Sequence, residues 1–303
     1  MSMNSERFRI WLAFFIVCGV WGSTWLAIKI GLQTVPPFLA AGLRFAVASG
    51  VLLLIVRFRR LPIPLTRDAQ KVYLTLGVIS FSIPFALVYW GQQFIPSGLS
   101  SVLFAAYPFW VAIFSHLFLK DEPLDLFKSL GIVLGFLGLL VIFSSDLHWS
   151  DPMALLGMCA VLVSTVLQGF SLIMIKKYGQ LVSPFVMTFV GISIGAVVLV
   201  AMGFLFEEVA SVVWNSVAVG SIIYLAVVGS VLTFVSYYWL LKRIEAVYLS
   251  LTSLVNPIVA VLLGALVLGE TLEPATFAGA ALVLLGILVA NGKYFYEKIR
   301  MAA

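Results

Sequence analysis

Polar and aromatic side chains interrupt otherwise apolar stretches of this chain, and their types favour ligand binding over catalysis. Arg44 is the one ionic residue that we expect well inside such a stretch, about 8 residues from the outer end of 36–56, or on the order of 12 Å along an α-helix. A charge at that depth is costly and is normally paired. Arg44 could bind the carboxylate of a small solute, or it could clamp helix-end carbonyls or an acidic group of a loop.

Two aromatic pairs, Tyr89-Trp90 and Tyr238-Trp239, recur about 149 residues apart. Aromatic rings with a polar edge suit an enclosed pocket, because they combine apolar contact area with a hydrogen-bonding group. The same side chains are also common where a helix meets the lipid headgroups. The pairs therefore predict either a pocket wall or an interfacial belt.

Two prolines at the same spacing follow a polar residue, since Tyr107 precedes Pro108 and Asn256 precedes Pro257. Proline removes a backbone hydrogen bond, so we expect free carbonyls inside both helices, next to a cavity, with Pro108 and Pro257 as hinge or cavity residues. Asn256 is a costly amide in apolar surroundings and should have a partner or a ligand. Serine and threonine in these stretches could instead bond their own helix backbone. The predicted substrate-binding residues are Trp21, Ser23, Thr24, Arg44, Tyr89, Trp90, Tyr107, Ser164, Gln168, Tyr238, Trp239 and Asn256.

Groups that would support other chemistry are missing from the apolar stretches. All 13 acidic residues lie outside these stretches or at their ends. Proton- or sodium-coupled carriers commonly need a carboxylate within the membrane. His116 could titrate, but we interpret it as packed or interfacial. The sequence predicts no catalytic residue, no cofactor and no metal site.

The composition places the chain in a membrane. Of its 303 residues, 62% are hydrophobic and only 10% are charged, where about 25% is usual for soluble domains. So few charges cannot cover a water-facing surface, and runs of about 20 apolar residues are long enough to span a bilayer. We predict an all-α membrane protein with ten transmembrane helices, at about 10–30, 36–56, 72–92, 97–118, 125–144, 153–175, 184–206, 217–241, 246–268 and 274–293.

The connections between these spans differ in charge. Most of the 18 basic residues fall in every second connection and at the two ends of the chain. The alternate connections carry acidic residues instead: Asp146, Asp151, Glu207, Glu208, Glu270 and Glu273. The excess of basic residues in cytoplasmic loops predicts that both termini are cytoplasmic.

Several residues near the ends of the spans have structural interpretations. We expect Lys29 to extend its amine to the interface, and Glu122 and Glu270 to cap the helices that follow them. Small residues four positions apart predict helix-packing seams. These are Gly131 with Gly135, Gly191 with Gly195, and Gly42-Ala46-Gly50.

The two halves of the chain match each other at a nearly constant offset of about 148 residues. Gly22 and Lys29 correspond to Gly169 and Lys176, and later glycines and prolines follow the same offset. We divide the chain into two five-helix repeats, 1–148 and 149–303. Because five is odd, the second repeat must be inserted upside down relative to the first. Inverted repeats are typical of transporters, since two similar halves can exchange conformations around a central site.

The order of several short segments resembles the EamA family of the drug/metabolite transporter superfamily. These segments are Trp21-Gly22-Ser23-Thr24-Trp25, Leu43-Arg44-Phe45, Gly98-Leu99-Ser100-Ser101, Asp121-Glu122-Pro123-Leu124, Asn256-Pro257 and Leu268-Gly269-Glu270-Thr271-Leu272. The resemblance covers nearly the whole chain and implies a ten-helix carrier that exports amino acids, related metabolites or drug-like compounds across a bacterial inner membrane. The family shares Arg-Phe across many cargo types, which favours the structural role of Arg44. Gln168 departs from the pattern, because it stands at the repeat position of Trp21.

We therefore predict a facilitator or exchanger with two partners, a small-molecule substrate and the lipid bilayer, and with no affinity for nucleic acid. The alternatives are a membrane enzyme, a lipid scramblase or a channel. An enzyme should show clustered His, Asp or Glu, and only His116 and His148 are present. A channel should show an unbroken polar stripe along one helix. The sequence predicts neither the cargo nor the oligomeric state.

Overall fold

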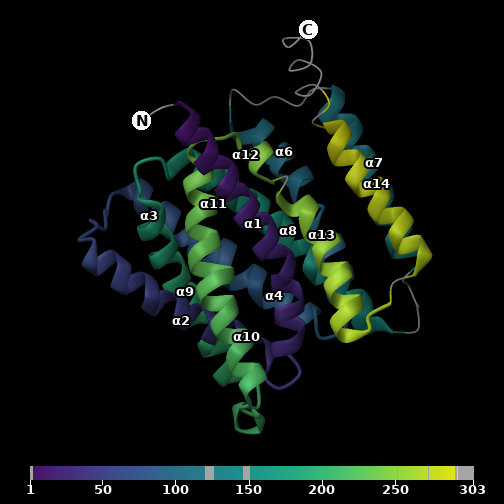
Figure 1. Cartoon of the computed structure of the whole chain (residues 1–303), viewed down its shortest axis with the longest axis horizontal. Helices are drawn as coiled ribbons and strands as arrows, with labels where there is room; N and C mark the ends of the chain where they lie inside the picture. Colours follow the sequence, from purple (N-terminus) through teal and green to yellow (C-terminus); the bar gives the residue numbers. More distant parts are fainter. Residues whose placement is uncertain are drawn as a thin grey trace.

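A computed structural model describes residues 3–119, 126–145, 151–250, 252–271, 273–290 and 292. The regular structure of these residues is helical throughout (Figure 1). In chain order the helices are α1 (Met3–Gly31), α2 (Pro37–Phe58), α3 (Arg67–Leu74), η1 (Thr75–Ser82), α4 (Ile83–Gly91), α5 (Ser97–Phe104), α6 (Tyr107–Phe118), α7 (Leu126–Ser145), α8 (Pro152–Tyr178), α9 (Pro184–Phe206), η2 (Val209–Ser211), α10 (Ser216–Ala226), η3 (Val227–Leu232), α11 (Thr233–Leu241), α12 (Ala246–Ser250), α13 (Thr252–Leu263), η4 (Gly264–Leu268) and α14 (Pro274–Ala290).

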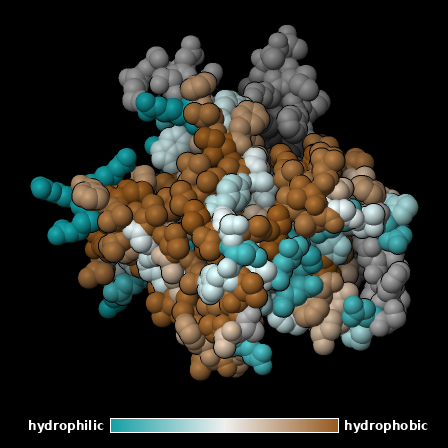
Figure 2. Space-filling model, turned by 60° about the horizontal axis from the view of Figure 1, so that its bottom comes forward, coloured by the Kyte–Doolittle hydropathy of each residue, from teal (hydrophilic) through white to brown (hydrophobic). Residues whose placement is uncertain are grey.

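The predicted all-α membrane fold is confirmed. Within the described residues, seven helical stretches are long and apolar enough to cross a membrane: Phe8–Gly31, Pro37–Phe58, Arg67–Gly91, Ser97–Phe118, Pro152–Tyr178, Pro184–Phe206 and Ser216–Leu241. Three shorter apolar helices cover Leu126–Gly138, Val255–Leu268 and Pro274–Gly286. Apolar side chains cover most of the face in Figure 2, and the side chain of Phe58 is 82% exposed. An apolar outer surface of this kind fits a lipid environment. The number of ten crossings and the side of the termini stay predictions.

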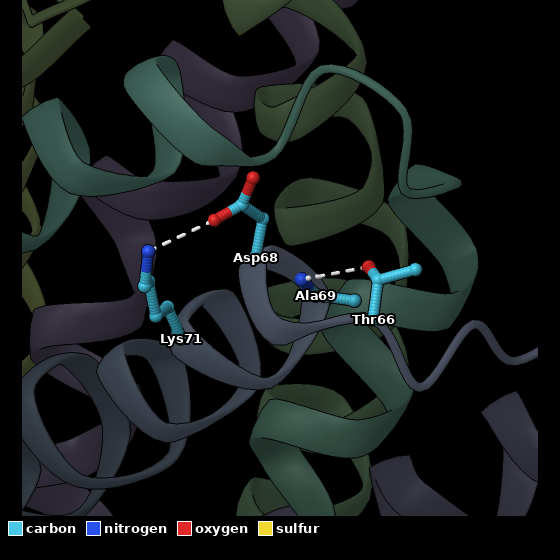
Figure 3. A network of polar contacts seen from close by, with 4 residues as sticks. All are labelled: Thr66, Asp68, Ala69 and Lys71. Atoms are coloured by element: carbon cyan, nitrogen blue, oxygen red, sulfur yellow. Dashed lines mark hydrogen bonds and ion pairs between the residues drawn. The ribbon is translucent and has the colours of Figure 1, made fainter.

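Helix starts follow local sequence signals. The hydroxyl of Thr66 accepts a hydrogen bond from the backbone N–H of Ala69 at 3.3 Å and so caps α3. One turn further, Lys71 Nζ lies 2.9 Å from Asp68 Oδ1 (Figure 3). Asp151 caps α8 and Asn215 caps α10 in the same manner.

Two of the spans contain a π-helical segment at matching positions. The segment η1 joins α3 to α4, and η3 joins α10 to α11. Each ends near a serine whose hydroxyl donates to the carbonyl five residues earlier, Ser82 to Gly77 at 2.6 Å and Ser230 to Leu225 at 2.9 Å. Such bulges leave some carbonyls without their usual helical partner, which makes them available to other donors.

Pro108 and Pro257 occupy different positions in their helices, one at a helix start and one inside a helix. The helix stops at Phe104 and restarts at Tyr107, so Pro108 stands in the first turn of α6. In the first turn of a helix the N–H that proline lacks would have no helical partner anyway. The free carbonyl that we expected inside a continuous helix at Pro108 is therefore not found. Pro257 does lie inside α13, as expected.

Glycines allow two pairs of helices to approach closely in a symmetric manner. A Cβ added to Gly286 of α14 would lie 2.5 Å from the carbonyl oxygen of Gly131 in α7, and one added to Gly138 of α7 would lie 2.6 Å from that of Gly279. These contacts require α7 and α14 to run antiparallel, and Figure 1 shows the two helices next to each other. Since Gly131 corresponds to Gly279 and Gly138 to Gly286, exchanging the halves reproduces the seam.

The same relation holds nearer the centre. Gly22 of α1 packs against Val259 of α13, and Gly169 of α8 packs against Trp110 of α6. Val259 and Trp110 correspond at the repeat offset, so each half donates the same contact to the other. The helix pair α2 and α9 also packs together, and Gly42 contacts Val200 there.

One predicted seam is only partly formed. Nothing lies within 4 Å of a Cβ at Gly50, and Ala46 is exposed, so Gly42-Ala46-Gly50 packs through Gly42 alone. The prediction was wrong for the other two residues because a seam needs a facing helix along its whole length, and the small residues do not show which helix faces them. The division of the chain at residues 148 and 149 falls in 146–150, outside the described residues, and stays a prediction.

Candidate functional site

A central cavity lies among helices of both halves. It encloses about 770 Å³ of empty space, a value that includes the open space at its mouth. The helices α1, α2, α4, α8, α11 and α13 contribute to it, with η1 and the junction of α5 and α6. Its wall is formed by Trp21, Thr24, Trp25, Ile28, Arg44, Ser80, Phe85, Val88, Phe104, Tyr107, Gln168, Leu172, Ile175, Phe234, Tyr237, Tyr238, Thr252, Ser253 and Asn256.

The structure brings together many of the residues that the sequence singled out. The predicted binding residues that line the cavity are Trp21, Thr24, Arg44, Tyr107, Gln168, Tyr238 and Asn256. They come from spans far apart in the chain. Among the described residues of the wall there is no Asp or Glu, and Arg44 is the one cation.

Other predicted residues lie outside the wall. Ser23 Oγ donates to the carbonyl of Val20 and shares a 2.6 Å hydrogen bond with the Tyr224 hydroxyl. Ser164 donates to the carbonyl one turn back, as the backbone-bonding interpretation expects.

Both tryptophans of the aromatic pairs also lie away from the cavity. Trp90 packs edge-on against Phe94, and Trp239 lies under the guanidinium of Arg243, 3.9 Å from the ring centre. Adjacent residues of a helix point about 100° apart. When the tyrosine of a pair points into the protein core, the tryptophan that follows it therefore points to a different side of the helix.

Arg44 connects the two halves from within the core. Its side chain is 2% exposed, and three of its nitrogens donate hydrogen bonds. Nε donates to Ser230 Oγ at 2.9 Å, Nη1 to the Tyr89 hydroxyl at 3.2 Å and Nη2 to the carbonyl of Gly229 at 3.1 Å. Gly229 and Ser230 belong to η3, so the guanidinium binds the π-helical carbonyl. The sequence predicted helix-end carbonyls or an acidic group of a loop as structural partners of Arg44, and the partners found are instead a carbonyl and two hydroxyls within the spans. A role of Arg44 in binding cargo stays a prediction.

Aromatic rings and hydroxyls surround the rest of the cavity. The hydroxyls of Tyr107 and Tyr237 are 2.9 Å apart and hydrogen-bonded. The ring of Trp21 lies 4.8 Å from that of Tyr237 and 5.3 Å from that of Phe234. Phe234 and Tyr237 line the cavity although neither was predicted to do so. The available signal was that Tyr237 directly precedes the predicted residue Tyr238.

Asn256 is an amide without its full set of partners. It is 2% exposed, and within the described residues its Oδ1 has no hydrogen-bond partner. The two ends of an amide are assigned by their surroundings, so exchanging them leaves the same position unpaired. An unpaired buried polar atom costs free energy unless a ligand, a water or a conformational change satisfies it.

Charged side chains cap helices on both sides of the cavity, again in a symmetric manner. Lys29 Nζ donates to the carbonyls of Gln92 and Ile95, at 2.6 and 2.9 Å. Lys176 Nζ donates to those of Leu241 and Ile244, at 2.8 and 2.6 Å. Lys29 therefore ties α1 to the end of α4 instead of extending to the interface. The expectation was wrong because carbonyls at a helix end attract a nearby ammonium more strongly than a distant interface does.

Glu270 and Glu207 cap helices of the opposite half. Glu270 accepts from the backbone N–H groups of Ser97 and Gly98 at the start of α5, and from the Ser97 hydroxyl. Glu207 accepts from the first N–H groups of α2. Glu270 was expected to cap the helix that follows it, and this was wrong because its two carboxylate oxygens bind the start of α5, which comes from a distant part of the chain. Glu122 lies outside the described residues.

A lysine outside the spans, Lys242, holds the end of α11 against the connection between α8 and α9. Lys242 Nζ donates to the carbonyls of Gln180 and Val182, both at 2.6 Å. Burial, with a smaller effect of the neighbouring Arg243 charge, lowers the pKa of Lys242 from its ordinary value.

Comparisons with known proteins agree with this geometry. The model of the EamA-like transporter family matches residues 9–144 and 155–292. The chain is 30% identical over 291 residues to the uncharacterized transporter YoaV of Bacillus subtilis, covering 96% of this chain and 99% of that one. It is 28% identical to the uncharacterized inner membrane transporter YedA of Escherichia coli K12, covering 94% and 91%. A solved crystal structure with 20% identity shares the fold at a TM-score of 0.69 over 92% of this chain and 96% of that one. With two matched segments covering most of its length, this multi-pass membrane protein belongs to the EamA-like transporter family.

Proposed function

We propose that the protein is a secondary carrier that exports small organic metabolites, most of all amino acids or related compounds, across a bacterial inner membrane. It works as a facilitator or exchanger by alternating access, so that the central cavity opens to one side at a time. The observation that carries the proposal is the central cavity itself. It is lined from both halves, contains a single cation, and has unpaired hydrogen-bonding capacity at Asn256.

The wall suits a solute with a carboxylate and an apolar body. A guanidinium has five N–H donors, and Arg44 uses three of them on protein acceptors. Two donors stay for a carboxylate, while Asn256 offers an acceptor to an amine or a hydroxyl of the same solute. Trp21, Phe104 and Tyr237 supply aromatic surface for the rest of the molecule.

Uncoupled transport agrees with the charges of the wall. Proton- and sodium-coupled carriers commonly need a carboxylate within the membrane. The described residues of the wall include none, which favours a cycle driven by the gradients of the cargo. The matched contacts of Gly22 and Gly169 support alternating access, because smooth, close helix surfaces in both halves permit equivalent packings to exchange.

The test uses purified protein in proteoliposomes loaded with a panel of labelled amino acids. We expect faster release than from protein-free vesicles, and slower release from an Asn256→Leu variant that keeps its thermal stability. A parallel assay with fluorescent phospholipids distinguishes a scramblase. The proposal fails if the panel shows no protein-dependent flux while phospholipids cross faster.

A further inference from the structure

A second hollow lies apart from the central cavity, on the side predicted to be cytoplasmic. This groove is formed by α1, α9, α11 and the end of α2, which contact one another along the side of the molecule. It encloses about 1100 Å³ of empty space, including its open side. Its lining residues are Arg9, Leu12, Ala13, Ile16, Arg59, Leu61, Ser183, Pro184, Phe185, Val235, Ser236 and Trp239.

The groove offers an apolar path that is open to the bilayer. Leu12 is 49% exposed, and its neighbours Trp11 and Phe15 are also exposed on α1. Ile16 and Val235 continue the apolar lining towards the interior of the membrane. A hydrocarbon chain is the occupant that such a path fits, because it is the material that surrounds the helices at this depth.

The end of the groove that we predict to face the cytoplasm is cationic. Arg9 and Arg59 line it, and no Asp or Glu is found among its lining residues. The guanidinium of Arg59 lies 5.0 Å from the centre of the Phe185 ring, and Arg243 stacks on Trp239 just outside. Among the described residues, the carboxylate of Glu6 lies near this end of the groove, with its Oε1 3.7 Å from Arg243 Nε. The positive excess is complementary to a phosphate.

The helix that starts in the groove also differs from its counterpart in the other half. The carboxylate of Glu207 accepts from the N–H groups of Phe38 and Leu39 at the start of α2. At the start of α9, the side chain of Ser183 makes no cap hydrogen bond. This end of α9 adds favourable N–H groups to a site that the arginines and the apolar lining define.

We propose that this groove binds an anionic phospholipid, with the phosphate between Arg9 and Arg59 and an acyl chain along α1 and α11. The lipid bridges the first half, through α1 and α2, and the second half, through α9 and α11. It therefore stabilises the arrangement of the halves in which the groove is open. Basic pockets between membrane helices are suited to such head groups.

The test titrates the purified full-length chain in a neutral detergent and follows its Tm. Phosphatidylglycerol should raise the Tm at lower concentration than phosphatidylcholine. Glycerol phosphate, which has the head group without a chain, should not raise it. Removing both cations in an Arg9→Gln, Arg59→Gln double variant should raise the half-maximal phosphatidylglycerol concentration by about 25-fold, at about a fivefold effect for each basic residue. An Arg67→Gln variant, exposed on the same side but outside the groove, should titrate like the unmodified protein.

A Leu12→Trp variant tests the acyl path while both arginines stay in place, and it also serves if the double variant is unstable. It should weaken phosphatidylglycerol binding and leave the Tm in detergent alone nearly unchanged, because Leu12 is half exposed. The proposal is overturned if phosphatidylcholine and phosphatidylglycerol give equal shifts, if glycerol phosphate gives the full shift, or if Leu12→Trp titrates like the unmodified protein.

Discussion

Replacing Arg44 by lysine keeps the positive charge but removes the planar group that holds two halves of the molecule together. The three partners of Arg44 are a serine hydroxyl, a tyrosine hydroxyl and a backbone carbonyl, each bound by a different nitrogen. The single ammonium of a lysine cannot occupy three positions at once. We expect Arg44→Lys to keep one of these hydrogen bonds and to lose two.

The size of the effect follows from those two bonds. A hydrogen bond to a charged group contributes about 1.5–3 kcal/mol, and polar pairs in membranes lie at or below the low end of such ranges. Two lost bonds at about 1.5 kcal/mol each lower the free energy of unfolding by about 3 kcal/mol. For a chain of 303 residues the Tm should fall by about 5 °C.

The assay is thermal unfolding in detergent, with Arg57→Lys as the matched control. Arg57 lies on the same helix α2 and is exposed, so its replacement should leave the Tm unchanged. The reasoning is refuted if Arg44→Lys unfolds at the same temperature as the control. If such a stable variant also lost flux of anionic cargo while keeping neutral cargo, Arg44 would be a binding residue without a structural role.

Three further changes test other contacts. Glu270→Gln should lower the free energy of unfolding by about 1–2 kcal/mol, because both carboxylate oxygens accept hydrogen bonds from the start of α5 and an amide has only one acceptor oxygen. Glu273 is exposed, so Glu273→Gln is the control in the same thermal assay. Gly22→Ala should lower the free energy of unfolding by about 1–3 kcal/mol, since its Cβ would lie 2.6 Å from the side chain of Val259. Its control, Gly19→Ala on the same helix, has open space around it and should be neutral or stabilising. Equal Tm values for the two variants would argue against the seam. Reporter domains fused to the two ends of the chain should be active on the same, cytoplasmic side of the membrane, and activity on opposite sides would exclude an even number of spans.

Hydropathy and charge were enough to predict the class of the fold, because long apolar runs have one stable form in lipid. They could not show how each helix is turned. Most spans are apolar all round, so no stripe distinguishes the inward face. Tyr238 therefore lines the cavity as expected, while Trp239, one residue later, lies on the groove instead.

Contacts between segments far apart in the chain were also not predictable from the sequence. Lys29 and Glu270 were correctly placed near helix ends, but their partners are the ends of helices from other parts of the chain, which local sequence does not show. The break after Phe104 was also hidden, since Ala105 and Ala106 favour a continuous helix by propensity. In contrast, Arg44 and Asn256 stood out because each is costly in lipid without a partner.

Solute counterflow tests the central claim most directly. Proteoliposomes are loaded with an excess of one unlabelled amino acid that the protein releases, and a trace of the same labelled compound is added outside. A carrier whose cavity faces one side at a time exchanges labelled for unlabelled molecules, so the internal label should rise transiently above the external concentration and then decay. A monotonic approach to equal concentrations, with no overshoot, would contradict alternating access.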